Sequence, residues 1–149
     1  MNFKGTVTIN APREKVWKFL TNPEQLADCA PGLESLEILI PNEKFRAVAS
    51  VGFGAVKATF VTDATWMDLE PPNRAKMKIH GKAPGSVVDG TSEMMLRDGD
   101  KPGETVLNWS SDVTVIGAIA SLAARLMGPV TQKLTDAFFE SVRKKIEEP

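Results

Sequence analysis

The sequence predicts an α+β fold in which a curved, seven-stranded antiparallel sheet wraps around one long C-terminal helix. Two patterns predict it. Apolar and polar residues alternate along most of residues 33–115, and residues 119–146 carry an apolar stripe at three- and four-residue steps. Strict alternation gives a strand one apolar and one polar face, which is typical of an antiparallel sheet covered on one side only. The long helix is the segment that can cover it.

The N-terminal part of the chain contributes a strand and two short helices. Residues 3–9 alternate as a strand, which Asn10-Ala11-Pro12 ends. A helix follows with Pro12 near its first turn, where a missing N–H costs little. Asn22-Pro23 ends that helix and starts a second, shorter one, and residues 30–32 then form a turn.

Six further strands are predicted between residues 33 and 115, because turn signals separate the alternating segments. These signals are Pro41-Asn42-Glu43, Gly52 to Gly54, Pro71-Pro72-Asn73, Pro84-Gly85 and Asp98-Gly99-Asp100. The helix after them would run about 40 Å, long enough to cross a whole sheet. Gly128-Pro129 falls inside it, and we expect a kink or break there because proline removes a backbone donor and clashes with the preceding turn.

Length and composition define the class of protein. We expect residues 1–149 to form a single domain. The formal net charge of −1 argues against binding to nucleic acid, and the lone cysteine, Cys29, excludes an internal disulfide. The sequence has neither a signal peptide nor an apolar run of about 18 residues. We therefore expect a cytoplasmic protein whose contact with the inner face of the cell membrane is at most peripheral.

Groups suited to catalysis are scarce. The only histidine, His80, falls on the polar face of its predicted strand, so a Ser–His–Asp arrangement lacks a base. No His, Cys or carboxylate spacing is typical of a metal site. The polar residues predicted to face inward are few: Thr62, Asp68, Ser92 and Ser111. We expect no catalytic residues, no metal and no tightly bound cofactor.

The inward positions instead predict a cavity. They mix bulky apolar residues with alanine, glycine and serine, which leave space if the sheet bends away from the helix. A large apolar cavity with few polar anchors is the usual form of a small-molecule site. We expect it to be lined by Phe53, Phe60, Trp66, Met77, Ile79, Met94, Trp109, Leu122, Leu126, Met127 and Val130.

Several short motifs carry a resemblance to a known family. They are Asn22-Pro23-Glu24-Gln25-Leu26 leading to Cys29-Ala30-Pro31-Gly32, then Val56-Lys57-Ala58-Thr59-Phe60, Leu69-Glu70-Pro71-Pro72, Gly90-Thr91-Ser92, and Lys133-Leu134 through Phe138-Phe139. With these motifs the chain resembles the carbon monoxide dehydrogenase G-subunit family, within the START-type (SRPBCC) helix-grip superfamily.

The resemblance implies a helix-grip fold and a non-catalytic accessory protein of a carbon monoxide dehydrogenase-type molybdenum hydroxylase. It also implies that the cavity binds a hydrophobic molecule, such as a quinone or another lipid-like ligand. Many members continue into an apolar tail, whereas this sequence ends at Glu147-Glu148-Pro149, so we expect peripheral or partner-mediated membrane contact. Two alternatives stay open: a cyclase/aromatase-like enzyme that uses the same cavity, and a structural interaction domain without a ligand.

Overall fold

The predicted α+β architecture is confirmed. The computed structural model describes residues 1–53 and 55–147, apart from the side chain of Phe53. Its elements in chain order are β1 (Asn2–Ile9), α1 (Arg13–Leu20), α2 (Pro23–Ala27), β2 (Leu33–Ile40), β3 (Lys44–Phe53), β4 (Val56–Glu70), β5 (Arg74–Ala83), β6 (Ser86–Asp98), β7 (Thr105–Gly117) and α3 (Ala120–Glu147). The strands form one sheet in the order β1-β7-β6-β5-β4-β3-β2, and every neighbouring pair is antiparallel.

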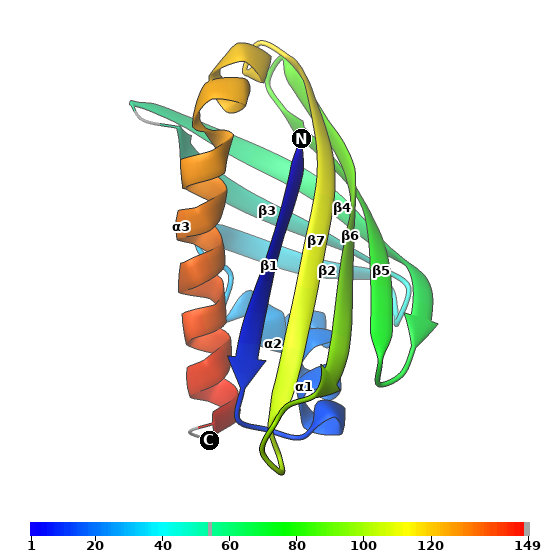
Figure 1. The fold of residues 1–149 in the computed structure, drawn as a ribbon. Coiled ribbons are helices and arrows are strands. Elements are labelled where there is room, and N and C mark those ends of the chain that lie inside the picture. The colour runs from blue at the N-terminus through cyan, green and yellow to red at the C-terminus, as the bar shows by residue number, and fades with distance from the viewer. Residues whose placement is uncertain (54, 148–149) are drawn as a thin grey trace.

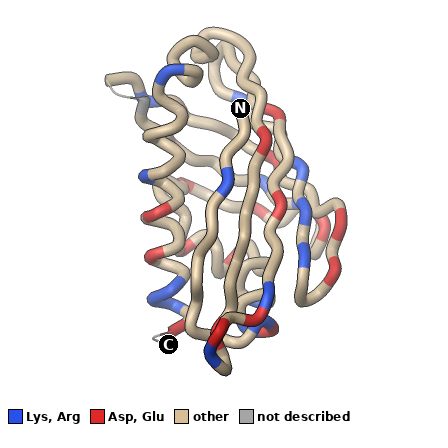
Figure 2. The backbone as a smooth tube through the Cα atoms, viewed as in Figure 1, with Lys and Arg blue, Asp and Glu red and all other residues tan. Residues whose placement is uncertain are grey.

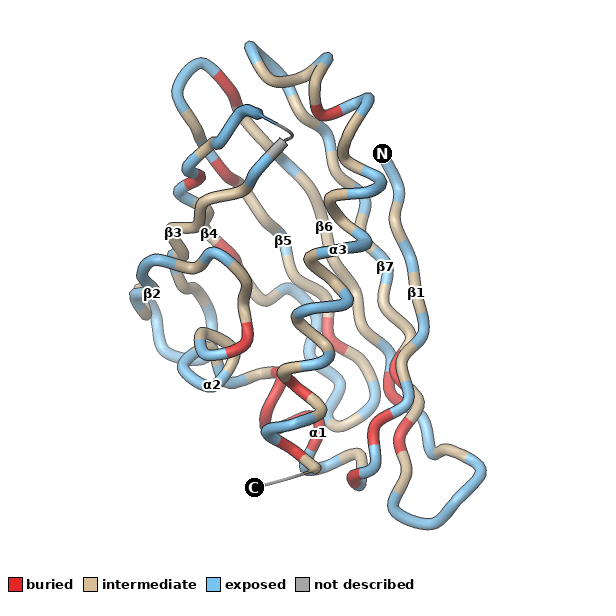
Figure 3. Tube along the Cα trace, turned by 90° about the vertical axis from the view of Figure 1, so that its left-hand side faces the viewer, coloured by how far each residue is buried: buried red, intermediate tan, exposed pale blue. Residues whose placement is uncertain are grey.

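The sheet curves around α3, and the short helices close one end of the space between them (Figure 1). The first strand pairs with the last, so β1 lies beside β7 and the two edges of the sheet are β1 and β2. Most of the buried residues gather at the closed end, around α1 and the last turns of α3 (Figure 3). The largest side chains that are fully buried are those of Ile9, Val16, Thr105, Leu107, Val142 and Ile146.

Local interactions fix the closed end. The Asn22 side chain caps α2, because its Oδ1 accepts hydrogen bonds from the backbone N–H groups of Glu24, at 3.1 Å, and Gln25, at 3.4 Å. The hydroxyl of Thr105, which is fully buried, donates to the carbonyl oxygen of Ala11 at 2.6 Å. This bond ties the link between β1 and α1 to the start of β7, so the short helices are held over the end of the sheet.

The disruption expected at Gly128-Pro129 takes the form of a kink, and one expectation about a strand needs correction. The helix α3 continues through Pro129 without a break, although its first turns are tilted relative to the rest (Figure 1). A tilt accommodates the proline ring while the later turns stay regular. Asp68 does not face inward: the pairing of β4 with β5 shifts register between Trp66 and Asp68, and Asp68 is exposed. One extra residue in a strand reverses which face the following side chains occupy.

Within residues 1–53 and 55–147, neither α3 nor any shorter helix combines the length and the apolar character that crossing a bilayer requires.

Candidate functional site: a cavity between the sheet and the long helix

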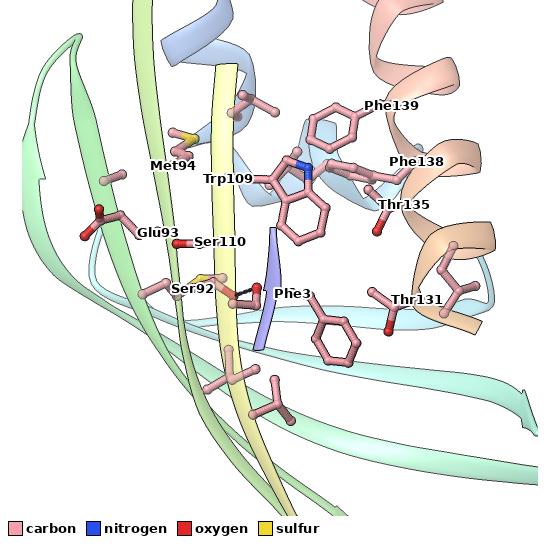
Figure 4. Close-up of a pocket in the computed structure, with 18 of the residues that line it drawn as sticks. Phe3, Ser92, Glu93, Met94, Trp109, Ser110, Thr131, Thr135, Phe138 and Phe139 are labelled. Carbon is pink, nitrogen blue, oxygen red and sulfur yellow. Dashed lines mark hydrogen bonds between the residues drawn. The ribbon is translucent and has the colours of Figure 1, made fainter. Parts of the chain in front are cut away.

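A cavity of about 450 Å³ lies between the concave face of the sheet and α3 (Figure 4). Its walls come from β1 and from β3 through β7, and α1, α2 and α3 contribute the rest. The inward residues of the strands are mostly apolar, and the residues of α3 that border the cavity begin at Met127 and end at Phe139. The cavity therefore lies beside the middle of α3, above the packed core at the closed end.

Six of the eleven residues expected at the site border this cavity: Trp66, Met77, Ile79, Met94, Trp109 and Met127. Phe60 is buried in the sheet without bordering the cavity, and Leu122, Leu126 and Val130 are half-buried on α3 away from it. The side chain of Phe53 lies outside the described residues. Whether the six bind a ligand stays a prediction.

The sequence analysis missed several residues of the lining. On α3 these are Thr131, Leu134, Thr135, Phe138 and Phe139, and on the sheet they include Phe3, Phe45, Val88 and Val113. A signal was present, since Leu134 and Phe138 belong to the predicted apolar stripe of the helix. The stripe gives the face of α3 that meets the sheet, but it does not say at which turn the sheet bends away.

Aromatic rings surround one side of the cavity. Figure 4 shows the indole of Trp109, from β7, pointing between the helix and the sheet, with Phe3 and Phe138 beside it. Phe138 packs edge-to-face with Phe139, with ring centroids 5.0 Å apart and an interplanar angle of 71°. Edge-to-face packing is a favourable arrangement of aromatic rings, so Phe138 and Phe139 support each other on this aromatic wall of the cavity.

Five residues with hydroxyl groups border the cavity: Ser110 is exposed, and the other four are half-buried. Ser92 on β6 and Ser111 on β7 are paired in register, and their hydroxyl oxygens are 2.7 Å apart. Thr131 and Thr135 face them from α3 (Figure 4). The two serines had been expected to face inward, and the sheet register places them there. The two threonines were missed because threonine is common on both faces of a helix.

Charged groups lie around the cavity rather than in it. Glu93 borders it, but its carboxylate turns toward Arg74, with Oε2 of Glu93 3.0 Å from Nη2 of Arg74. A second bond to Glu70 is the main reason that the pKa of Arg74 is raised, and Glu93 adds to it. His80 lies on the outer, partly exposed face of the sheet, as the sequence predicted, and it pairs there with Asp89. Neither pair can move a proton within the cavity.

Cys29 is buried in the core and does not border the cavity. Burial raises the pKa of its thiol, although Lys145 nearby opposes this. A buried thiol with a raised pKa is a poor nucleophile. Among the described residues, no three His, Cys, Asp or Glu side chains come together as a metal site would require.

A curved antiparallel sheet that wraps around a long helix, with a cavity between them, defines a helix-grip protein. The chain belongs to the carbon monoxide dehydrogenase G-subunit (CoxG) family, whose model matches residues 5–147. This match confirms the family resemblance that the sequence motifs indicated. A comparison with curated protein sequences returned no match.

Solved structures show the same fold. A conserved protein from Geobacillus kaustophilus has 26% sequence identity and a TM-score of 0.90, with 99% of this chain and 96% of that chain covered. An aromatase/cyclase from Streptomyces sp. R1128 has 19% identity and a TM-score of 0.67, covering 97% and 94%. Truncated norcoclaurine synthase from Thalictrum flavum has 12% identity and a TM-score of 0.68, covering 100% and 94%. At such low identities, the last two matches show the fold alone.

Proposed function

We propose that this protein is a non-catalytic accessory protein that binds a hydrophobic small molecule of the quinone type, or another lipid-like ligand, in the cavity beneath α3. The observation that carries the proposal is the cavity itself: about 450 Å³, bordered mainly by aromatic, aliphatic and methionine side chains. Its volume falls within the range of roughly 300–1,000 Å³ that is usual for small-molecule sites.

The lining favours a carrier over an enzyme. A cyclase or aromatase needs groups inside the cavity that give and take protons. In the described part of the chain, Glu93 is the only ionisable residue on the lining, and its carboxylate is engaged with Arg74. The two serines and two threonines can hold a ligand, but their hydroxyls are far too weakly acidic or basic to act alone near neutral pH. A filled structural core is also disfavoured, because the side chains leave a void.

The family supports a role beside a carbon monoxide dehydrogenase-type molybdenum hydroxylase. In this proposal the protein holds the hydrophobic molecule and presents it to that enzyme, so that the chemistry takes place in the partner. Purified enzyme of this type should reduce a sparingly soluble quinone faster when the protein is added. A variant with a blocked cavity, such as Val113→Trp, should lose the effect, since Val113 borders the void.

A peripheral contact with a membrane forms part of the same proposal. Residues 50–62, 81–88 and 113–135 contain no Asp or Glu. These segments include the adjoining ends of β3 and β4, the β5–β6 hairpin and the start of α3, which lie at the end of the molecule opposite α1 (Figure 1). The basic residues near that end lie within strands and the helix: Lys57 on β4, Lys82 on β5 and Arg125 on α3 (Figure 2).

The end of the molecule opposite α1 also exposes apolar side chains. Val56 is 46% exposed and Ile116 is 61% exposed. Lys57, Lys82 and Arg125 are exposed, and none of them forms an ion pair within the described residues. Unpaired cations beside exposed aliphatic groups complement an anionic lipid surface, where each lysine or arginine contributes about 1 kcal/mol of binding free energy. A lipid-like ligand would then be taken up where it is dissolved.

Direct titration tests the binding step. Isothermal titration calorimetry with menadione, a quinone without an isoprenoid tail, should give saturable binding to the wild-type protein and none to Val113→Trp. Circular dichroism shows whether the variant remains folded. Equal heats for the folded variant and the wild type would place any binding outside the cavity and contradict the proposal.

A further inference from the structure

We infer that the four half-buried cavity hydroxyls form two opposed hydrogen-bonding anchors, which select a neutral ligand with carbonyl or hydroxyl oxygens on two sides of a flat ring. The inference rests on the proposed function and deepens it. Ser92 and Ser111 form the anchor on the sheet, and Thr131 and Thr135 form the anchor on α3 (Figure 4). The aromatic wall around Trp109 lies beside the space between them.

The serine pair has a hydrogen to offer. The two hydroxyl oxygens are 2.7 Å apart, so one hydroxyl donates its hydrogen to the other. The serine that accepts keeps its own hydrogen, and a hydroxyl can both donate and accept. Since the pair is half-buried in the cavity wall, this remaining hydrogen can bond to a carbonyl oxygen of a bound molecule.

The threonine pair is unpartnered on the opposite wall. Threonine hydroxyls in helices commonly bond to the carbonyl four residues earlier. Thr21, which follows α1, bonds in this way to the carbonyl oxygen of Trp17 at 2.7 Å. Thr131 and Thr135 make no side-chain hydrogen bond within the described residues. Four residues apart on one helix, they lie on the same face and present two free hydroxyls to the cavity.

The cavity has no group that would compensate an anionic ligand. A carboxylate moved from water into an apolar site loses its hydration and needs a cation or several donors in return. The single ionisable residue found along the described lining is Glu93, which is itself acidic and bonded to Arg74. Fatty acids and other anions are therefore disfavoured, whereas a neutral ring with two oxygens can bond to both walls.

Three probes of similar ring size separate the effect of the ligand oxygens from the effect of ligand charge in calorimetric titrations. Menadione carries two carbonyl oxygens, 2-methylnaphthalene carries none, and 2-naphthoate carries a charge. We expect the wild type to bind menadione most tightly and 2-naphthoate most weakly. Removing one anchor, by Ser92→Ala with Ser111→Ala or by Thr131→Val with Thr135→Val, should weaken menadione binding about three- to tenfold. The affinity for 2-methylnaphthalene should stay within a factor of two.

Thr114→Val serves as the control, because Thr114 is exposed on the outer face of β7, and it should leave all three affinities unchanged. Equal wild-type affinities for menadione and 2-methylnaphthalene would overturn the anchors while leaving the binding function intact. Tight binding of 2-naphthoate would also overturn the anchors, because they are expected to select a neutral ligand, and it would leave the binding function intact. Binding of none of the three would contradict the proposed function itself, and this inference with it.

Discussion

The indole of Trp109 lies directly against Gly5 of the neighbouring strand. A Cβ atom added at Gly5 would lie 2.7 Å from Nε1 of Trp109, closer than such atoms approach each other. The two residues are paired across β1 and β7, and both face the helix. The absence of a side chain at Gly5 is therefore what allows Trp109 to reach its position on the cavity wall.

Gly5→Ala should consequently displace the indole. We expect the free energy of unfolding to fall by about 1–3 kcal/mol, the usual result of overpacking, and menadione affinity to fall with it. Denaturant titration and calorimetry measure the two quantities. Gly52→Ala is the matched control, because a Cβ at Gly52 meets nothing within 4 Å. If Gly5→Ala and Gly52→Ala had the same free energy of unfolding and the same menadione affinity, Gly5 would have no role in placing Trp109.

The buried Thr105 hydroxyl gives a prediction about the closed end. Thr105→Val keeps the shape of the side chain but removes the donor to the carbonyl of Ala11. The buried carbonyl loses that partner, and we expect a loss of about 1–3 kcal/mol in the free energy of unfolding. Thr114→Val, on the exposed face of the same strand, should change it by less than about 0.5 kcal/mol. Urea denaturation followed by tryptophan fluorescence distinguishes the two.

Asp63 gives a prediction about pH. A hydrogen bond from Arg46, with Nε 2.7 Å from Oδ1 of Asp63, is the main reason that the pKa of the Asp63 carboxyl is lowered. A group whose pKa falls on folding stabilises the protein above its unfolded pKa of about 3.9, and this contribution disappears as the pH falls through the folded pKa.

Asp63→Asn should thus lower the free energy of unfolding slightly at pH 7, and the difference from wild type should shrink below about pH 4. Thermal unfolding of both proteins between pH 2.5 and 7 measures this. A difference that stayed constant across the range would show that the ion pair is not its source.

Charge reversal tests the membrane contact. The double variant Lys57→Glu, Lys82→Glu should bind vesicles of phosphatidylglycerol at least tenfold more weakly than wild type, because each cation contributes about 1 kcal/mol near an anionic surface. Arg97→Glu with Lys101→Glu makes the same change in charge at the opposite end of the sheet, where both residues are exposed. Co-sedimentation measures both. If both double variants lost the same vesicle affinity, the net charge of the protein, and not this surface, would account for the binding.

The predictable parts of the structure are those that depend on periodicity. Alternation identified the strands and their inward faces, and the apolar stripe identified the face of α3. The inward face was wrongly assigned where the strand register shifts, as it does after Trp66, because a single extra residue leaves no signal in composition. The inward position of Ser92 and Ser111 followed from the same alternation.

The position of the cavity along α3 could not be predicted in the same way. It depends on how sharply the sheet curves away from the helix, which is a property of all the strands together. For this reason Leu122 and Leu126 were expected to line the cavity, whereas Thr131 and Thr135 border it. The close approach of Trp109 to Gly5 likewise depends on the register of strands more than a hundred residues apart.

The six methionines offer the most direct test of the central claim that the cavity is a ligand site. Met77, Met94 and Met127 border it, whereas Met1, Met67 and Met95 are exposed, at 41%, 50% and 49%. In protein labelled with ¹³C at the methionine methyl groups, titration with menadione should shift the NMR signals of the first three in a saturable way and leave the other three in place. Shifts confined to Met1, Met67 and Met95, or none at saturating menadione, would contradict the account.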